Sequence, residues 1–103
     1  MRTYEMMAIF HPQLADEDLS GAIDQVAGYV TNAGGEVTGT ARENPWGRRR
    51  LAYPIRVNGQ DVRDGFYVLY NFNVDARRIT DLERSLKLND RVIRHIIVKP
   101  DEE

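Results

Sequence analysis

Hydrophobic and polar positions alternate over residues 2–10 and then change to a helical spacing. One face of a strand here would carry Tyr4, Met6, Ala8 and Phe10, because successive side chains of a strand point to opposite sides. Between residues 16 and 33 the apolar positions recur every three or four residues, which predicts an amphipathic helix. Its apolar stripe would consist of Leu19, Ile23, Val26, Val30 and Ala33. Gly34-Gly35 then ends the helix, because glycine adopts a left-handed cap without a steric penalty.

An extended segment is predicted over residues 36–57, with interruptions at Pro45 and Gly47. Pro54 lies in its second half and has no amide hydrogen to donate to a neighbouring strand. This strand should therefore lie at an edge of the sheet, or bulge there. Residues 58–65 are expected to form a polar connection, with an Asn-Gly pair at its start and an Asp-Gly pair at its end.

The second half of the chain continues with a strand, a helix and a strand. Alternation predicts a strand over residues 66–74, whose core face would carry Phe66, Val68, Tyr70, Phe72 and Val74. Asp75 is a suitable N-cap for a second helix, in which the apolar positions are Ile79, Leu82 and Leu86. Asn89-Asp90 should end that helix, and residues 92–98 should form the last strand.

The order β-α-β-β-α-β predicts an α+β fold of the ferredoxin-like class, a split β-α-β sandwich. Four antiparallel strands would form one sheet, with both helices on one face. In this topology the second strand is an edge strand, which agrees with the position of Pro54. Residues 1–99 are predicted to form a single domain, and residues 100–103 a short acidic tail.

Composition restricts the function classes. The chain has 103 residues and no cysteine, which excludes disulfides, thiolate zinc sites and a cysteine nucleophile. No apolar run approaches the ~18 residues of a membrane span, so no membrane association is expected. The first residues lead directly into a predicted strand, so we expect no signal peptide and a cytoplasmic location.

The formal net charge of −2 hides a basic middle segment. Residues 42–63 carry six arginines and two acids, whereas residues 1–41 carry one arginine and six acids. Of the 14 basic residues, 12 are arginine, whose planar fork of donors suits phosphate and stacks on bases. A local nucleic-acid-binding patch is therefore indicated, since simple nucleic-acid binders are basic throughout and this chain is not.

The centre of that segment is residues 46–55, with the sequence WGRRRLAYPI. On a strand, Arg48 and Arg50 would leave one side and Arg49 the other. Three guanidinium groups between Trp46 and Tyr53 could hold phosphates while the rings stack on bases. The alternative is a solvated edge strand that uses charge to prevent strand-to-strand aggregation. Composition does not decide between the two.

A catalytic site has little support. His11 and His95 are far apart in the chain, and no spacing resembles a metal site, a phosphate-binding glycine loop or a nucleophile triad. A small phosphatase on this fold would require an anion-binding loop after the first strand, but residues 11–14 contain neither glycine nor arginine. We therefore expect no enzyme, no catalytic residues, no metal, no cofactor and no small-molecule substrate.

The RNA-recognition motif has the same order of elements and displays aromatic residues on its central strands. Its octapeptide begins with a basic residue, glycine, an aromatic residue and a small residue. Here Asp64 precedes Gly65-Phe66, and Tyr67 replaces the small residue. The aromatic residues of this strand are therefore better explained as core than as a base-stacking surface.

Short segments along the whole chain, in a consistent order and spacing, share a known pattern. The segments are 46–55, 1–5, Pro12 and Leu14, 65–67, 82–86 and 90–94. Together they resemble the bacterial small-subunit ribosomal protein six family, from residue 1 to about residue 99. The chain departs from that pattern at residues 58–64, which are longer than the shortest loops of the family, and at Asn89, where some members are basic.

The resemblance implies a non-catalytic ribosomal protein that binds the central domain of small-subunit ribosomal RNA, paired with ribosomal protein eighteen. The RNA-binding candidates carried over by position are Arg2, Arg48, Arg49, Arg50, Lys87, Arg91 and Arg94. The candidates for contact with the partner protein are Trp46, Tyr53, Tyr67 and Leu69. Tyr67 and Leu69 would add an apolar patch to the sheet face away from the helices. The alternative function is a non-ribosomal protein-interaction module that uses its sheet edge without RNA.

Overall fold

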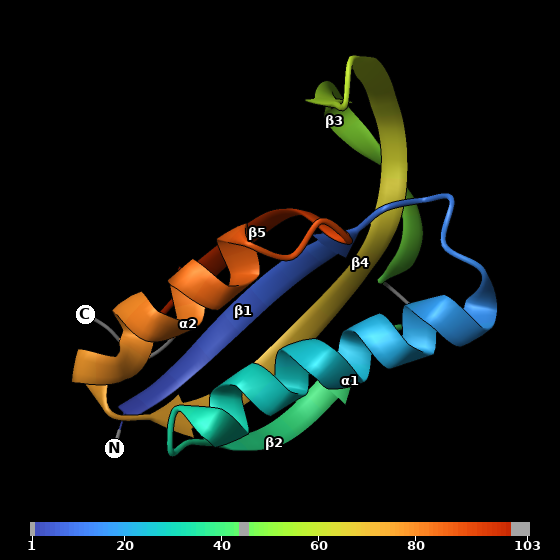
Figure 1. Cartoon of the computed structure of the whole chain (residues 1–103). Helices are drawn as coiled ribbons and strands as arrows, with labels where there is room; N and C mark the ends of the chain where they lie inside the picture. The colour runs from blue at the N-terminus through green and yellow to red at the C-terminus, as the bar shows by residue number, and fades with distance from the viewer. Residues whose placement is uncertain (1, 44–45, 100–103) are drawn as a thin grey trace.

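The computed structural model describes residues 2–43 and 46–99. The predicted interruption at Pro45 and the predicted tail from residue 100 lie outside the described residues. The elements in chain order are β1 (Arg2–Phe10), α1 (Asp16–Asn32), β2 (Glu36–Ala41), β3 (Gly47–Val57), β4 (Gln60–Val74), the 3-10 turn η1 (Ala76–Arg78), α2 (Ile79–Lys87) and β5 (Val92–Val98) (Figure 1).

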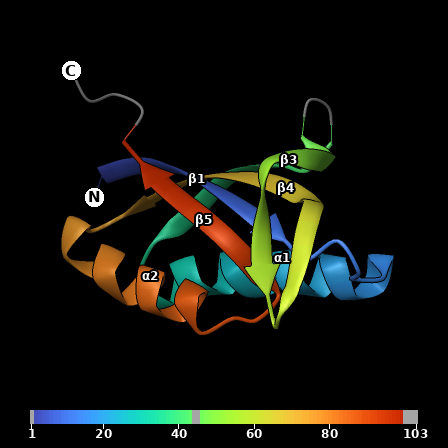
Figure 2. The same ribbon diagram turned by 90° about the horizontal axis from the view of Figure 1, so that it is seen from above.

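All strand pairs are antiparallel, and the sheet order is β2-β4-β1-β5, with β3 paired to the first part of β4. Figure 2 shows that α1 and α2 cover the same face of this sheet. The ferredoxin-like fold is therefore confirmed, including the edge position of the second strand.

The number of strands differs from the prediction of four, because β2 and β3 together occupy the place of one edge strand. β2 pairs with the second half of β4, from Glu36 opposite Asn73 to Ala41 opposite Leu69. β3 resumes the pairing with Gly47 opposite Tyr67. Between the two strands, the Trp46 amide donates to the Glu43 carbonyl at 3.3 Å. Gly47 has φ of 98°, a left-handed conformation that glycine adopts without strain.

The predicted polar connection over residues 58–65 is wrong, because only Asn58-Gly59 connects β3 and β4. Both residues have positive φ, 51° and 80°, as a two-residue hairpin turn requires. Residues 60–65 belong to β4, so the two strands extend as an arm (residues 51–63) beyond the two-layer part of the fold (Figure 1). Residues 51–54 of β3 lie between the Arg50–Asp64 and Ile55–Val62 pairs, opposite Arg63 alone. The bulge expected at Pro54 is therefore confirmed.

The main core lies between the sheet and the two helices. All five residues of the predicted stripe of α1 are buried, and Leu82 and Leu86 of α2 are buried with them. The alternating core faces of β1 and β4 are also confirmed, with Met6 and Phe72 fully buried. The hydroxyl of Tyr70 donates to the carbonyl of Ile23 at 2.9 Å, and burial raises the pKa of this hydroxyl above its usual value.

A second, smaller apolar cluster lies outside this core and contains Ile9, Leu51 and Val62. Tyr67 of β4 and Ile93, next to Val92 at the start of β5, pack against it. The arm is thereby joined to the sheet by side-chain packing as well as by strand pairing.

Candidate nucleic-acid interface

The arginine run begins β3, where Arg48, Arg49 and Arg50 lie opposite Phe66, Gly65 and Asp64 of β4. Arg48 contacts the loop that leads into α1, while Arg49 lies over the Trp46 ring, which itself stacks on Tyr67. The predicted separation of Arg48 and Arg49 to opposite sides of the strand is therefore confirmed.

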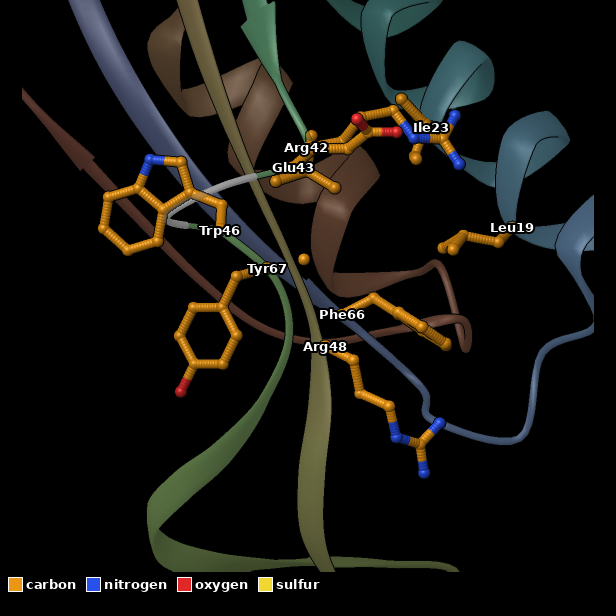
Figure 3. A pocket seen from close by; sticks show the side chains of 10 residues that line it. Leu19, Ile23, Arg42, Glu43, Trp46, Arg48, Phe66 and Tyr67 are labelled. Atoms are coloured by element: carbon orange, nitrogen blue, oxygen red, sulfur yellow. The ribbon is translucent and has the colours of Figure 1, made fainter.

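Arg48 is held by three contacts in the folded chain. Its Nη2 forms an ion pair with Asp64 Oδ2 at 2.8 Å, and its Nη1 donates to the carbonyl of Pro12 at 3.1 Å. Its guanidinium lies 5.3 Å from the centre of the Phe66 ring; Figure 3 shows both side chains at one end of the pocket. Arg48 therefore connects β3, β4 and the β1–α1 loop.

These contacts predict a structural effect for Arg48→Gln. The unfolding free energy should fall by about 1 kcal/mol, because the ion pair is partly exposed to solvent and only one charged hydrogen bond accompanies it. Equilibrium urea unfolding measures this change. Arg56→Gln is the matched control, since Arg56 is also ion-paired between β3 and β4, to Asp61 at 3.1 Å, but lies beside the hairpin turn of the arm. Equal stability of the two variants would contradict this role of Arg48.

Arg49, Trp46 and Tyr67 form a column on the face away from the helices. The Trp46 and Tyr67 rings are stacked, with centroids 6.4 Å apart and an angle of 15° between their planes (Figure 3). The Arg49 guanidinium lies 5.7 Å from the centre of the Trp46 ring. Such contacts hold a charged group and two rings in fixed relative positions. Tyr67 does not lie beneath the helices, so the predicted strand phase is confirmed.

The same face carries an apolar row that crosses three strands. Leu69 of β4 lies opposite Met7 of β1, which lies opposite Ile96 of β5. Ile96 is 59% exposed and Val98 is 48% exposed, so β5, at the edge of the sheet, adds two large exposed aliphatic side chains to this row. These two residues were not among the predicted contacts, although alternation in β5 places both on one face. Tyr53, a predicted partner contact, lies in the bulge of the arm and is 80% exposed.

The other predicted basic residues lie around the domain. Arg94 of β5 is opposite Ile9, which is opposite Tyr67, so Arg94 is on the open face of the sheet. Arg91 lies in the turn before β5, where its carbonyl accepts from the His11 amide at 2.9 Å. Lys87 is the last residue of α2, whereas Arg2 starts β1 at the opposite end of the sheet. The arginine run, Arg91 and Arg94 are thus brought toward one end of the sheet, and Arg2 is not.

Asn89 has a structural role that was not predicted from the sequence. This buried side chain donates from Nδ2 to Gln25 Oε1 at 3.2 Å and to Tyr29 Oη at 3.1 Å. Its Oδ1 accepts from the Arg91 amide at 2.9 Å. Asn89 therefore connects the end of α2 to α1 and positions the backbone of Arg91.

A pocket of about 400 Å³ opens between α1 and the start of β3 (Figure 3). Its charged lining residues are Arg42, Glu43 and Arg48, with Leu19 and Phe66 among the apolar ones. Arg42 donates to Ser20 Oγ at 3.3 Å, and Arg48 is held as described above. Among the described lining residues, no general base is hydrogen-bonded to a nucleophile.

A second surface pocket, of about 460 Å³, is lined by Arg48, Arg49, Arg50, Arg63 and Asp64. Arg63 was missed by the sequence prediction, because it falls in the segment predicted to be a connection. Within residues 2–43 and 46–99, no three acidic or histidine side chains are grouped so that they could hold a metal ion. None of the helices in these ranges is long and apolar enough to cross a membrane.

Both the sequence and the fold of this chain are similar to those of known proteins. The family model described as ribosomal protein S6 matches residues 3–99. The fold is similar to that of 30S ribosomal protein S6 from Thermotoga maritima, with a TM-score of 0.83 and 23% sequence identity. The similarity covers 95% of this chain and 86% of that chain.

Proposed function

Since the chain belongs to the ribosomal protein S6 family, we propose that it binds the central domain of small-subunit ribosomal RNA together with ribosomal protein eighteen. As a member of this family it is an RNA-binding, structural component of the small ribosomal subunit, with a role in translation. The proposal includes the specific RNA domain, the heterodimer, a cytoplasmic ribosome as the location and the absence of catalysis.

The observation that carries the proposal is that one sheet face presents charged and apolar groups side by side. The column of Arg49, Trp46 and Tyr67 borders the apolar row formed by Leu69, Met7 and Ile96. Cationic side chains at one end suit phosphates, whereas exposed aliphatic side chains suit a protein. A surface of this kind can bind RNA and a protein partner at the same time.

The proposed residues divide accordingly. For contact with RNA we propose Arg2, Arg49, Arg50, Lys87, Arg91 and Arg94. Arg48 contributes indirectly, because its contacts with Asp64 and Pro12 fix the position of β3. For the partner protein we propose Trp46, Tyr53, Tyr67 and Leu69, with Ile96 added from the structure.

The direct test is a titration of central-domain RNA with the full chain at several salt concentrations, with and without ribosomal protein eighteen. Phosphate contacts require the RNA affinity to fall steeply with salt, whereas an apolar protein interface changes little. We expect a steep salt dependence and tighter RNA binding when the partner is present. Binding to a protein partner without any retained RNA would instead support the non-ribosomal interaction module.

Tyr67→Ala should weaken the heterodimer more than it weakens the fold. The substitution removes a half-buried ring from the stack with Trp46 and from the centre of the proposed protein contact. The dissociation constant for ribosomal protein eighteen should rise more than ~10-fold, as for an aromatic residue at the centre of an interface. Isothermal titration calorimetry measures this change, and thermal unfolding measures the cost to the fold.

Tyr67→Phe is the control, because it keeps the ring and its stacking and should bind nearly as the wild type does. An unchanged affinity of Tyr67→Ala for the partner would show that this face is not the protein contact.

A further inference from the structure

The pocket on the arm side of β3 has an unusual charge balance. Its lining contains four arginines, Arg48, Arg49, Arg50 and Arg63, and one acidic residue, Asp64. The first three come from β3, while Arg63 comes from β4, opposite the bulge of residues 51–54. Like charges gathered in this way repel one another, so a bound anion would stabilise the arrangement.

The Asp64 carboxylate cannot neutralise all four arginines, because it is already paired with Arg48. The Arg48–Asp64 ion pair is 2.8 Å long, and the second hydrogen bond of Arg48, to the Pro12 carbonyl, directs its guanidinium toward the β1–α1 loop. Arg49 is stacked against Trp46 at the other side. The side chains of Arg50 and Arg63 are exposed, and within the described ranges neither side chain forms a hydrogen bond or an ion pair.

We propose that this pocket binds one phosphate group of the RNA backbone, with Arg50 and Arg63 as its ligands. The inference rests on the proposed function and adds to it a residue, Arg63, that the family pattern did not indicate. Two arginine side chains from neighbouring strands can direct several N–H donors at one anion, and the planar fork matches the geometry of phosphate oxygens. Arg48 is a positioning residue here, because it neutralises Asp64 and holds the base of β3.

The first measurement uses inorganic phosphate as the probe on the full chain. The Nε–Hε signals of the arginines are followed by NMR during titration, with acetate at equal ionic strength as the comparison. Arg50 and Arg63 should shift with saturation in phosphate and much less in acetate. Arg56 should not shift, because it is ion-paired to Asp61 on the same arm. Equal responses of Arg50, Arg56 and Arg63, or a stronger response to acetate, would overturn the phosphate assignment.

The second measurement compares Arg63→Gln with Arg56→Gln in binding to central-domain RNA. Both variants lose one positive charge from the arm, so a difference between them reports the pocket and not the net charge. Arg63→Gln should weaken RNA binding about fivefold. The slope of log affinity against log salt should decrease in magnitude by about 0.7–0.9, the contribution of one phosphate contact. Arg56→Gln should stay within about twofold of the wild type.

The two proposals fail in different ways. If the wild-type chain binds the RNA with a steep salt slope and the two variants bind this RNA with equal affinity, the phosphate pocket is overturned and the ribosomal function stands. If the wild-type chain fails to bind this RNA even with ribosomal protein eighteen, but Arg50 and Arg63 still respond to phosphate, the proposed function fails and the anion pocket stands. Far-UV circular dichroism and thermal unfolding confirm that each variant is folded.

Discussion

Replacing Gly65 with alanine is expected to lower the unfolding free energy by about 3 kcal/mol, the upper part of the range for an overpacked site. A Cβ atom at this position would lie 2.6 Å from Ile9 Cγ2 and 3.1 Å from the carbonyl oxygen of Phe10. Ile9 is buried in the smaller apolar cluster, and its β-branched side chain has few alternative rotamers. The backbone of β4 must therefore move away from β1 to accommodate the extra atom.

Urea unfolding followed by circular dichroism measures this change, and the melting temperature should fall by more than ~10 °C for a domain of this size. Gly28→Ala is the matched control, because a Cβ atom added to this glycine in the interior of α1 would have nothing within 4 Å. That substitution should stabilise the chain by about 0.5–1 kcal/mol, since alanine is the better helix former. A Gly65→Ala variant as stable as the wild type would show that β1 and β4 can separate here without cost.

Gly65 also affects the candidate interface, because it lies opposite Arg49 in the β3–β4 pairing. A displacement of β4 at this point would shift the base of the arm and with it the arginine run. We therefore expect the destabilised variant to bind RNA more weakly even at temperatures where it is fully folded.

The double substitution of Arg49 and Arg50 with glutamine should have the largest effect on RNA binding. Two phosphate contacts would be lost, so the salt slope should fall by about 1.4–1.8 and the affinity by about 10²-fold at low salt. The unfolding free energy should change by only about 0.5 kcal/mol, since both side chains are exposed. A filter-binding titration of central-domain RNA over a range of salt concentrations measures both the slope and the affinity.

The control for this variant is the double substitution of Arg77 and Arg78 with glutamine, which removes the same charge. Arg77 and Arg78 are ion-paired to Asp75 and Asp81 at 2.8 and 2.9 Å, near the start of α2. A similar loss of affinity in both double variants would mean that net charge, and not the arginine run, controls RNA binding. Arg48 is left unchanged in this experiment, because its replacement would add the structural effect of its contacts with Asp64 and Pro12.

Periodicity and local chemistry determined most of the secondary structure from the sequence alone. The stripe from Leu19 to Ala33 is buried as its spacing predicts, and Gly34, with φ of 81°, ends α1. Asp75 accepts from the Arg77 amide at the start of η1, and Pro54 lies in a bulge of an edge strand. Each of these features depends on residues only a few positions apart, so the sequence pattern contains the physical cause.

The tertiary structure decided which distant residues meet. Arg48 and Arg49 are adjacent and chemically identical, yet one pairs with Asp64 and the other stacks on Trp46, because the register with β4 brings different groups to the two faces. The partners of Asn89 lie 60 and 64 residues away in the chain. Arg63 joins the arginine run only because the arm continues the strand pairing to Asn58-Gly59. Contacts of this kind depend on strand register and on the packing of the arm, and neither can be deduced from the spacing of residues within one segment.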